Sequence, residues 1–236
     1  MGTTTTIQEG ASIVGSKLAM ITKDKSFIPC SRCKCNNETL DHILTNCSGR
    51  RQDYIIRHDI IGKQVYKAIG RKYGLFEHFI NELVTIKNQN VELYWNRRMA
   101  KGKNTQPDIT LYDYKNQSII LFDVSIVKMK YLKTSFNLKR EKYNKLGLNL
   151  KNFKNSETNE IVFQKYEVIP IIITNEGLIH RRTIELFKTV NIKIEWGKAI
   201  SKLLFHNVQL IQRIYTKRGK WRKRGREFIN NQAIPD

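Results

Sequence analysis

Residues 118–127, SIILFDVSIV, are the segment that most constrains the fold of this chain. The run is apolar at both odd and even positions, which is typical of a central strand covered on two sides. The preceding segment DITLYDY, residues 108–114, also reads as a strand, and the intervening KNQ is a turn signal, so we predict a hairpin. Asp123 stands in the middle of the apolar run. An unpaired charge buried there costs several kcal/mol, so this carboxylate must be neutralised, paired or bound to a metal.

The rest of the chain alternates helical and extended patterns around this hairpin. Amphipathic spacing predicts helices at residues 59–69, 75–84, 135–150 and 196–215. The first of these helices has Asp59 as its expected N-cap. YEVIPIIIT, residues 166–174, is a further strand, which Pro170 places near a sheet edge or a strand end, and the following NEG is a turn. The order helix, strands, helix, strand, helix predicts an α/β domain with a mixed sheet flanked by helices.

The charge of the chain indicates a polyanionic partner. Its 236 residues include 42 Lys and Arg against 21 Asp and Glu, a net charge of +21. Clustered basic residues favour nucleic acid or an acidic membrane surface, because neutralising phosphates releases counterions. The alternative is a lysine-rich solvated surface. No apolar run approaches the roughly 18 residues of a membrane span, and no signal-peptide layout is present, so we expect a soluble, intracellular protein without disulfides.

The most concentrated positive charge lies near the end of the chain. Seven of the ten residues from 217 to 226 are basic, and one of the others is a tryptophan. Such a segment can bind phosphates while its aromatic ring stacks on a base. The alternative is a solvated tail whose tryptophan packs on the domain. The expected DNA-binding residues here are Lys217, Arg218, Lys220, Trp221, Arg222, Lys223, Arg224 and Arg226.

All four cysteines lie between positions 30 and 47, in CSRCKCNNETLDHILTNC. Cys30-x2-Cys33 is the tight turn that directs two thiolates at one ion. His42-x4-Cys47 lies in a segment whose apolar residues suggest a helix presenting the other two ligands. The four side chains therefore form a candidate tetrahedral zinc site.

The alternatives for this cluster are a redox-active CxxC or the use of Cys35 in place of Cys33. In our preferred reading, Cys35 is a spare thiol. Zinc would supply most of the folding free energy of these few residues, on the order of 10 kcal/mol. A closed four-ligand site does no chemistry, so we expect this module to bind or brace.

The hairpin suggests a partner for Asp123. Asp108 lies at the start of one strand and Asp123 in the next, so both carboxylates can reach the same end of the sheet. Paired carboxylates favour a hard ion, Mg²⁺ or Mn²⁺, together with waters and a phosphate. In the following helix, Lys139, Lys142 and Tyr143 share one face and can act on a phosphate there. Alternatively, these lysines are a solvated face, and Asp123 is paired with a buried Lys or Arg.

The order of these motifs resembles a known family. Over about residues 28–180, the chain carries six motifs in this order: CxxC, HxxxxC, Arg-His-Asp, Pro-Asp, a later Asp and Lys-x-x-Lys-Tyr. This order resembles the restriction-like endonuclease domain of site-specific, early-branching LINE-type non-LTR retrotransposons. That domain belongs to the PD-(D/E)xK superfamily and is similar to archaeal Holliday-junction resolvases. The resemblance implies a restriction-endonuclease-like mixed sheet with a small N-terminal CCHC zinc knuckle.

The resemblance also implies roles for individual residues. The metal-binding acids correspond to Asp108, after Pro107, and to Asp123. The superfamily lysine would stand at position 125, which is Ser125, and in the LINE branch its role moves to the next helix, here Lys139 and Lys142 with Tyr143. In the motif Arg57-His58-Asp59, the acid caps a helix and either basic residue contacts a DNA phosphate. Candidates for an additional upstream acidic ligand are Glu77, Glu82 and Glu92.

The activity implied is a Mg²⁺- or Mn²⁺-dependent DNA endonuclease. It would nick target-site DNA to a 5′-phosphate and a 3′-hydroxyl that primes reverse transcription of the element's RNA. The chain would then belong to a larger polyprotein with a reverse transcriptase and act in the nucleus, and double-strand cutting would favour a homodimer. The alternatives are a non-catalytic zinc-knuckle nucleic-acid-binding module and a Holliday-junction-resolvase-like nuclease.

The expected organisation has four parts. Residues 1–26 are a leader or linker, 27–50 the zinc knuckle, 51–215 the nuclease-like domain and 216–236 a basic tail.

Overall fold

The computed structural model describes residues 14–75, 85–99, 101, 105–151 and 163–230, with side chains described as far as Ile214. The chain divides into two compact units. One unit is Ile55–Ser201, and the other combines Met1–Tyr54 with Lys202–Asp236. The predicted boundaries did not anticipate that the N-terminal segment and the C-terminal segment form one unit.

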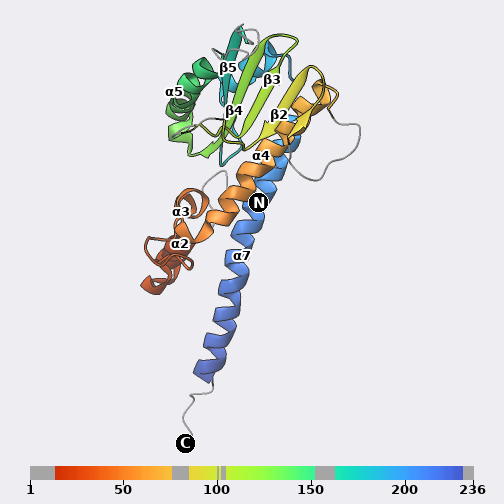
Figure 1. Ribbon diagram of the computed structural model, residues 1–236. Helices are drawn as coiled ribbons and strands as arrows, with labels where there is room; N and C mark the ends of the chain where they lie inside the picture. The colour runs from red at the N-terminus through yellow and green to blue at the C-terminus, as the bar shows by residue number, and fades with distance from the viewer. Residues whose placement is uncertain (1–13, 76–84, 100, 102–104, 152–162, 231–236) are drawn as a thin grey trace, which may run out of the picture. The chain divides into compact units, whose positions relative to one another are not determined.

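The unit Ile55–Ser201 is built on a five-stranded mixed sheet in the order β1-β2-β3-β4-β5 (Figure 1). The first four strands pair antiparallel, and β4 pairs with β5 in parallel. The predicted hairpin is β3 and β4, and Ile109 pairs with Phe122 at its open end. The α/β class with a mixed sheet is thus confirmed. The strands are β1 Ile86–Lys87, β2 Val91–Trp95, β3 Ile109–Asp113, β4 Ser118–Val127 and β5 Lys165–Thr174.

Strand β4 is covered on both faces, as its sequence predicts. Ile119 and Leu121 pack in an apolar cluster with Tyr143 of helix α5, Leu132–Lys151. On the other face, the ring of Phe122 stacks on Phe187 with ring centroids 5.7 Å apart. Because side chains alternate along a strand, the odd-numbered residues of β4 face α5. Asp123 belongs to this odd set.

Strand β5 is the edge strand predicted from its proline. Pro170 is opposite Asp123 on the parallel side of β4, and its carbonyl accepts a hydrogen bond from the Thr183 hydroxyl at 2.7 Å. Thr183 belongs to α6, Arg181–Thr189, a helix that the sequence analysis did not anticipate. The NEG turn follows β5, and Gly177 there has a φ of 90°, which glycine adopts without strain.

Helix α4, Arg51–Lys72, is longer than predicted. Asp59 lies inside it, so the prediction that Asp59 is an N-cap is wrong. The helix approaches β2 closely at Gly62, where an added Cβ would lie 2.5 Å from the Trp95 ring. Apart from Leu75, the helix expected at residues 75–84 lies outside the described residues.

The other unit contains the cysteine-rich segment. Helix α2, Gly15–Thr22, falls where a leader or linker was predicted. Helix α3, Leu40–Thr45, carries His42 as expected, but Cys47, the second ligand predicted for this helix, lies two residues beyond its end. Helix α7 begins at Trp196 as predicted but continues to Asn230. The apolar core of the unit joins α3 and α7 and consists of Val14, Ile43, Leu44, Leu210, Ile211 and Ile214. The burial of Val14 shows that at least the end of the predicted leader is part of a folded unit.

Candidate functional site

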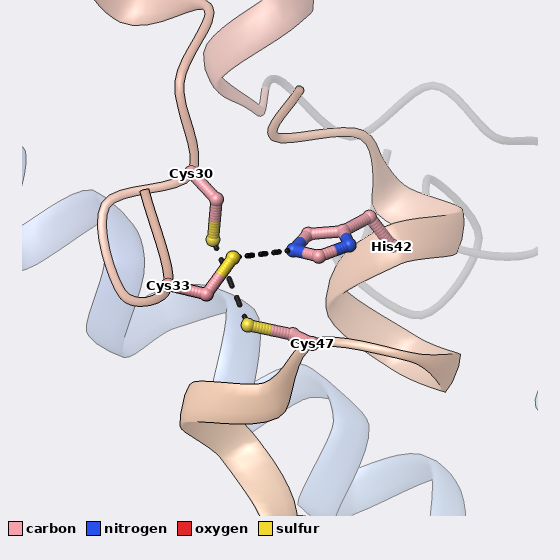
Figure 2. Close-up of side chains that lie close together, drawn as sticks. All are labelled: Cys30, Cys33, His42 and Cys47. Atoms are coloured by element: carbon pink, nitrogen blue, oxygen red, sulfur yellow. Dashed lines mark hydrogen bonds between the residues drawn. The ribbon is translucent and has the colours of Figure 1, made fainter. Parts of the chain in front are cut away.

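The four predicted zinc ligands converge on one point (Figure 2). The ligand atoms of Cys30, Cys33, His42 and Cys47 all lie within 4.8 Å of one another. The Cys30 and Cys47 sulfurs are 3.7 Å apart, and Cys33 Sγ is 3.2 Å from His42 Nε2. Tetrahedral zinc with Zn–S bonds of about 2.3 Å would separate its sulfurs by about 3.8 Å. These four residues can therefore hold a metal ion, as predicted.

The alternative ligand Cys35 is not part of this cluster. Its side chain is exposed, and its thiol donates a hydrogen bond to the Cys33 carbonyl at 3.0 Å. Lys34, between the two cysteines, has a φ of 62°, so the chain turns sharply after the second ligand. The turn therefore points Cys33 inward and Cys35 outward.

A buried carboxylate secures the loop of the cluster. Glu38 is fully buried, and its two oxygens accept hydrogen bonds from the backbone N–H groups of Ser31 at 2.7 Å and Gly15 at 3.2 Å. Gly15 begins α2, so Glu38 links the CxxC turn to the positive end of that helix. Tyr54 adds a second link, since its hydroxyl accepts from Cys47 N–H and donates to the Ile43 carbonyl. The ligands are thus pre-positioned by backbone contacts.

The thiols of the cluster differ in acidity. Burial raises the pKa of Cys47 to about 11, and its contact with Cys30 adds to the shift. Burial also acts to raise the pKa of Cys33, but hydrogen bonds from the Cys35 backbone and from His42 outweigh it and lower the value to about 6. Because a metal binds thiolates, loading the cluster must release protons.

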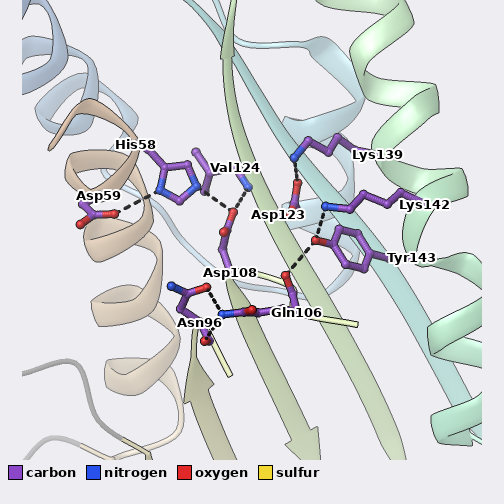
Figure 3. A network of polar contacts seen from close by, with 10 residues as sticks. All are labelled: His58, Asp59, Asn96, Gln106, Asp108, Asp123, Val124, Lys139, Lys142 and Tyr143. Carbon is purple, nitrogen blue, oxygen red and sulfur yellow. Dashed lines mark hydrogen bonds and ion pairs between the residues drawn. The ribbon is translucent and has the colours of Figure 1, made fainter. Parts of the chain in front are cut away.

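The second candidate site lies at the open end of the β3–β4 hairpin (Figure 3). Asp108 directly precedes β3, and the register that pairs Ile109 with Phe122 continues to place Asp108 beside Asp123. The Asp108 carboxylate accepts a hydrogen bond from Val124 N–H at 2.6 Å. The structure therefore brings together the two acids that the sequence placed fifteen positions apart.

A histidine from α4 pairs with Asp108. His58 Nε2 is 2.9 Å from Asp108 Oδ2, and its Nδ1 is 3.1 Å from Asp59 Oδ1. Burial lowers the pKa of His58, but the hydrogen bond and charge of Asp108, followed by those of Asp59, raise it to about 9. His58 is thus a cation at neutral pH. Both ring nitrogens of His58 thus face acids, and the predicted contact of His58 with a DNA phosphate stays a prediction.

Asp123 forms an ion pair with Lys139 of α5. The Asp123 side chain is 3% exposed, and Lys139 Nζ forms an ion pair with its Oδ2. Burial raises the pKa of Asp123, the charge of Asp108 raises it further, and Lys139 opposes both effects. The buried carboxylate is thus paired with a lysine, the alternative left open by the sequence. This lysine is also the first of the predicted basic residues.

Lys142 and Tyr143 complete the predicted set on α5. The Lys142 ammonium donates to the Tyr143 hydroxyl at 2.6 Å and lies 4.4 Å from the centre of its ring. The hydroxyl in turn donates to the carbonyl of Gln106 at 2.9 Å, which ties α5 to the loop before Asp108. Burial raises the pKa of Tyr143, and the charge of Asp123 adds to this shift. Tyr143 is therefore a neutral hydrogen-bonding group.

Arg57 is not placed for the predicted DNA contact. Its side chain is buried, and Nη1 donates to Asn175 Oδ1 at 2.9 Å. Asn175 directly follows β5, so Arg57 joins α4 to the end of that strand. This burial does not favour the phosphate contact predicted for Arg57, which stays a prediction.

The remaining predicted residues are placed as follows. The basic segment at residues 217–226 is helical in its backbone, as part of α7, and its side chains are outside the described set. Glu92 lies on β2 and accepts a short hydrogen bond from the Tyr94 hydroxyl. Glu77 and Glu82 lie outside the described residues.

Comparison of the sequence with protein-family models and with curated proteins finds no match. The endonuclease resemblance therefore rests on the order and spacing of the motifs. In the part of the chain that the structure describes, no helix is long and apolar enough to cross a membrane.

Proposed function

We propose that this chain is a Mg²⁺- or Mn²⁺-dependent DNA endonuclease domain. The observation that carries the proposal is the placement of Asp108 beside Asp123 at the end of β3 and β4, with Lys139 paired to Asp123. Two carboxylates can hold a divalent ion together with a substrate phosphate, and a lysine beside them can stabilise charge on that phosphate.

The two acids fit a hard divalent ion. Mg²⁺ is commonly held by one or two carboxylates, with waters and substrate phosphate as its other ligands. Among the described residues, only the Cys/His cluster gathers three or more Cys, His, Asp or Glu donors, so the acid pair supplies two ligands. Burial and the charge of Asp108 both raise the pKa of Asp123, so a cation bound at the pair would favour the ionised carboxylate.

The residues at this site would have separate roles in the reaction. A bound divalent ion would lower the pKa of a water and so supply the nucleophile. Asp108 and Asp123 would hold that ion, with Val124 N–H fixing the orientation of the first carboxylate. Lys139, which is partly exposed, would move toward the phosphate and stabilise its developing charge. Lys142 and Tyr143 would position the loop before Asp108.

We assign the biological role by resemblance alone. The domain would nick target DNA in the nucleus, leave a 5′-phosphate and a 3′-hydroxyl, and act within a polyprotein whose reverse transcriptase copies the element's RNA. The net charge of +21 supports a nucleic-acid partner. The Cys/His cluster would hold structural zinc, since three thiolates and one imidazole are a closed zinc ligand set.

Plasmid nicking tests the proposal. Supercoiled DNA with Mg²⁺ or Mn²⁺ should become relaxed, and Asp108→Asn and Asp123→Asn should each lower the nicking rate by about 10³-fold or more, since each removes a metal ligand. DNA binding, measured by gel retardation, should be nearly unchanged. Glu185→Gln, an exposed acid on α6, is the matched control and should nick at the wild-type rate.

A non-catalytic nucleic-acid-binding module is the second candidate. It is favoured by the pairing of Asp108 with His58 and of Asp123 with Lys139, because both charges are compensated without a metal. This candidate predicts DNA retardation without cleavage at every divalent-ion concentration. A resolvase would instead cut branched DNA in preference to linear DNA at equal salt.

A further inference from the structure

The segment between β4 and α5 has an unusual surface. Residues 128–133, KMKYLK, contain three lysines and no acid. Met129 and Tyr131, two positions apart in this segment, are each 48% exposed. Lys130 Nζ lies 5.0 Å from the centre of the Tyr131 ring. An exposed aromatic ring among lysines is the combination that binds single-stranded nucleic acid.

The segment is held rigidly. It forms a short 3-10 turn, Met129–Tyr131, in which Tyr131 N–H donates to the Lys128 carbonyl at 2.9 Å. The Thr134 hydroxyl donates to the Tyr131 carbonyl at 3.2 Å, and Asn175 N–H donates to the Val127 carbonyl at 3.1 Å. The ring of Tyr131 is therefore presented on an ordered backbone, which lowers the entropy lost on stacking.

The segment is also close to the acid pair along the chain. Asp123 lies on β4, five positions before its start, and Lys139 lies on the helix that follows. Leu132 and Lys139 are seven helical positions apart, which corresponds to a rise of about 10 Å. This length equals about three nucleotide steps along one DNA strand. A strand whose phosphate meets Lys139 can thus place a base near Tyr131.

We propose that Tyr131 stacks on an unpaired DNA base while Lys130 and Lys133 bind the flanking phosphates. The inference rests on the proposed function for the identity of the polyanion as DNA. It adds a substrate feature, a nucleotide out of the duplex about three positions from the scissile phosphate. A base inside an intact duplex offers no free face for stacking, so this surface distinguishes bulged or single-stranded DNA from paired DNA.

Binding by the full chain without divalent ions tests the proposal apart from cleavage. The probes are a duplex with a one-nucleotide bulge, the same duplex fully paired, and a single-stranded RNA, with affinity read by fluorescence anisotropy. Tyr131→Ala should bind the bulged probe about tenfold more weakly, as expected for one lost stacking contact. The fully paired duplex should be affected less than about twofold. Tyr131→Phe should retain wild-type affinity.

Tyr114→Ala is the matched control. Tyr114 is 39% exposed at the opposite end of the β3–β4 hairpin, and its removal should leave the affinity for both DNA probes unchanged. The inference would be overturned if Tyr131→Ala lost affinity equally for bulged and paired DNA, or lost affinity for neither. A loss confined to the RNA probe would overturn the assignment to DNA. If the wild type never nicks DNA but Tyr131 still governs binding to the bulge, the proposed nuclease function fails and this inference stands.

Discussion

The Cys/His cluster and the Asp108–Asp123 pair are assembled in opposite ways. The cluster takes four ligands from 18 consecutive residues, positioned by local turns and by Glu38. The acid pair depends on α4, β3, β4 and α5, and His58 lies 50 positions from its partner Asp108. The cluster is therefore defined by local spacing, whereas the acid pair depends on how two helices pack against the sheet. The two sites should respond differently to the same kinds of change.

Metal removal should give the largest effect and separate the two regions. Chelation of zinc, or Cys47→Ser, should remove on the order of 10 kcal/mol of folding free energy from the cluster, because a structural zinc ion contributes that much to the folding of its ligand segment. Proteolysis should then cut within residues 28–50, while the circular dichroism of the sheet unit persists. Cys35→Ser, which removes only the exposed thiol, is the control and should change nothing. Unchanged protease resistance after chelation would contradict a structural metal.

Removal of Lys139, the ion-pair partner of Asp123, should give the second-largest effect. Lys139→Met should lower nicking by about 10²–10³-fold, the effect of removing one group that stabilises transition-state charge. It should also raise the pKa of Asp123 further, because Lys139 opposes the effects of burial and Asp108. Carboxyl ¹³C NMR measures the shift, and the nicking rate measures the activity.

The control for this change is Lys145→Met, which removes an exposed lysine from the same helix. It should leave both measurements unaltered. A wild-type nicking rate in Lys139→Met would show that the ion pair is structural and would remove the lysine from the proposed site.

A change at a packing contact distant from both sites should lower the stability of the sheet unit that carries the acid pair, but not that of the cluster. Gly62→Ala places a Cβ 2.5 Å from the Trp95 ring, so α4 or the ring must move. We expect a loss of about 2 kcal/mol in unfolding free energy, as is typical of overpacking. Gly197→Ala, where an added Cβ meets nothing within 4 Å, is the control and should be neutral or slightly stabilising. Denaturant unfolding measures both, and equal stability of the two variants would contradict the close packing.

The smallest effect concerns pH. The charge and hydrogen bonds of the neighbouring acids hold the pKa of His58 at about 9, above its ordinary 6.5. The resulting stabilisation is fully present below pH 6.5 and is lost as the pH rises through 9. Since the His58 side chain is 31% exposed, screening limits the contribution to about 1 kcal/mol. His58→Gln should flatten this part of the curve of unfolding free energy against pH, measured without Mg²⁺ or Mn²⁺. An equal slope in the wild type and in His58→Gln would show that another group causes this pH dependence.

Several features could be predicted because their signals are local. The spacing of Cys30, Cys33, His42 and Cys47 favoured these ligands but left Cys35 as an alternative to Cys33, which only the structure excluded from the cluster. The two extended segments and the turn residues within 108–127 predicted the hairpin, and the amphipathic periods predicted α5 and the start of α7. Helices α2 and α6 and strands β1 and β2 were missed. Their segments are short, so tertiary contacts, such as that of Thr183 with Pro170, decide their structure.

The sequence by itself determined the Cys/His ligand set, the central strand with its buried acid and the strong positive charge. Each of these follows from spacing or composition within a short stretch. Only the tertiary structure decided that Lys139 neutralises Asp123, that His58 pairs with Asp108 and that Arg57 is buried against Asn175, 118 positions away. The physical reason is that a helical period shows which face of a helix is apolar, but not which strand that face will cover. The partners of a buried charge are therefore set by packing.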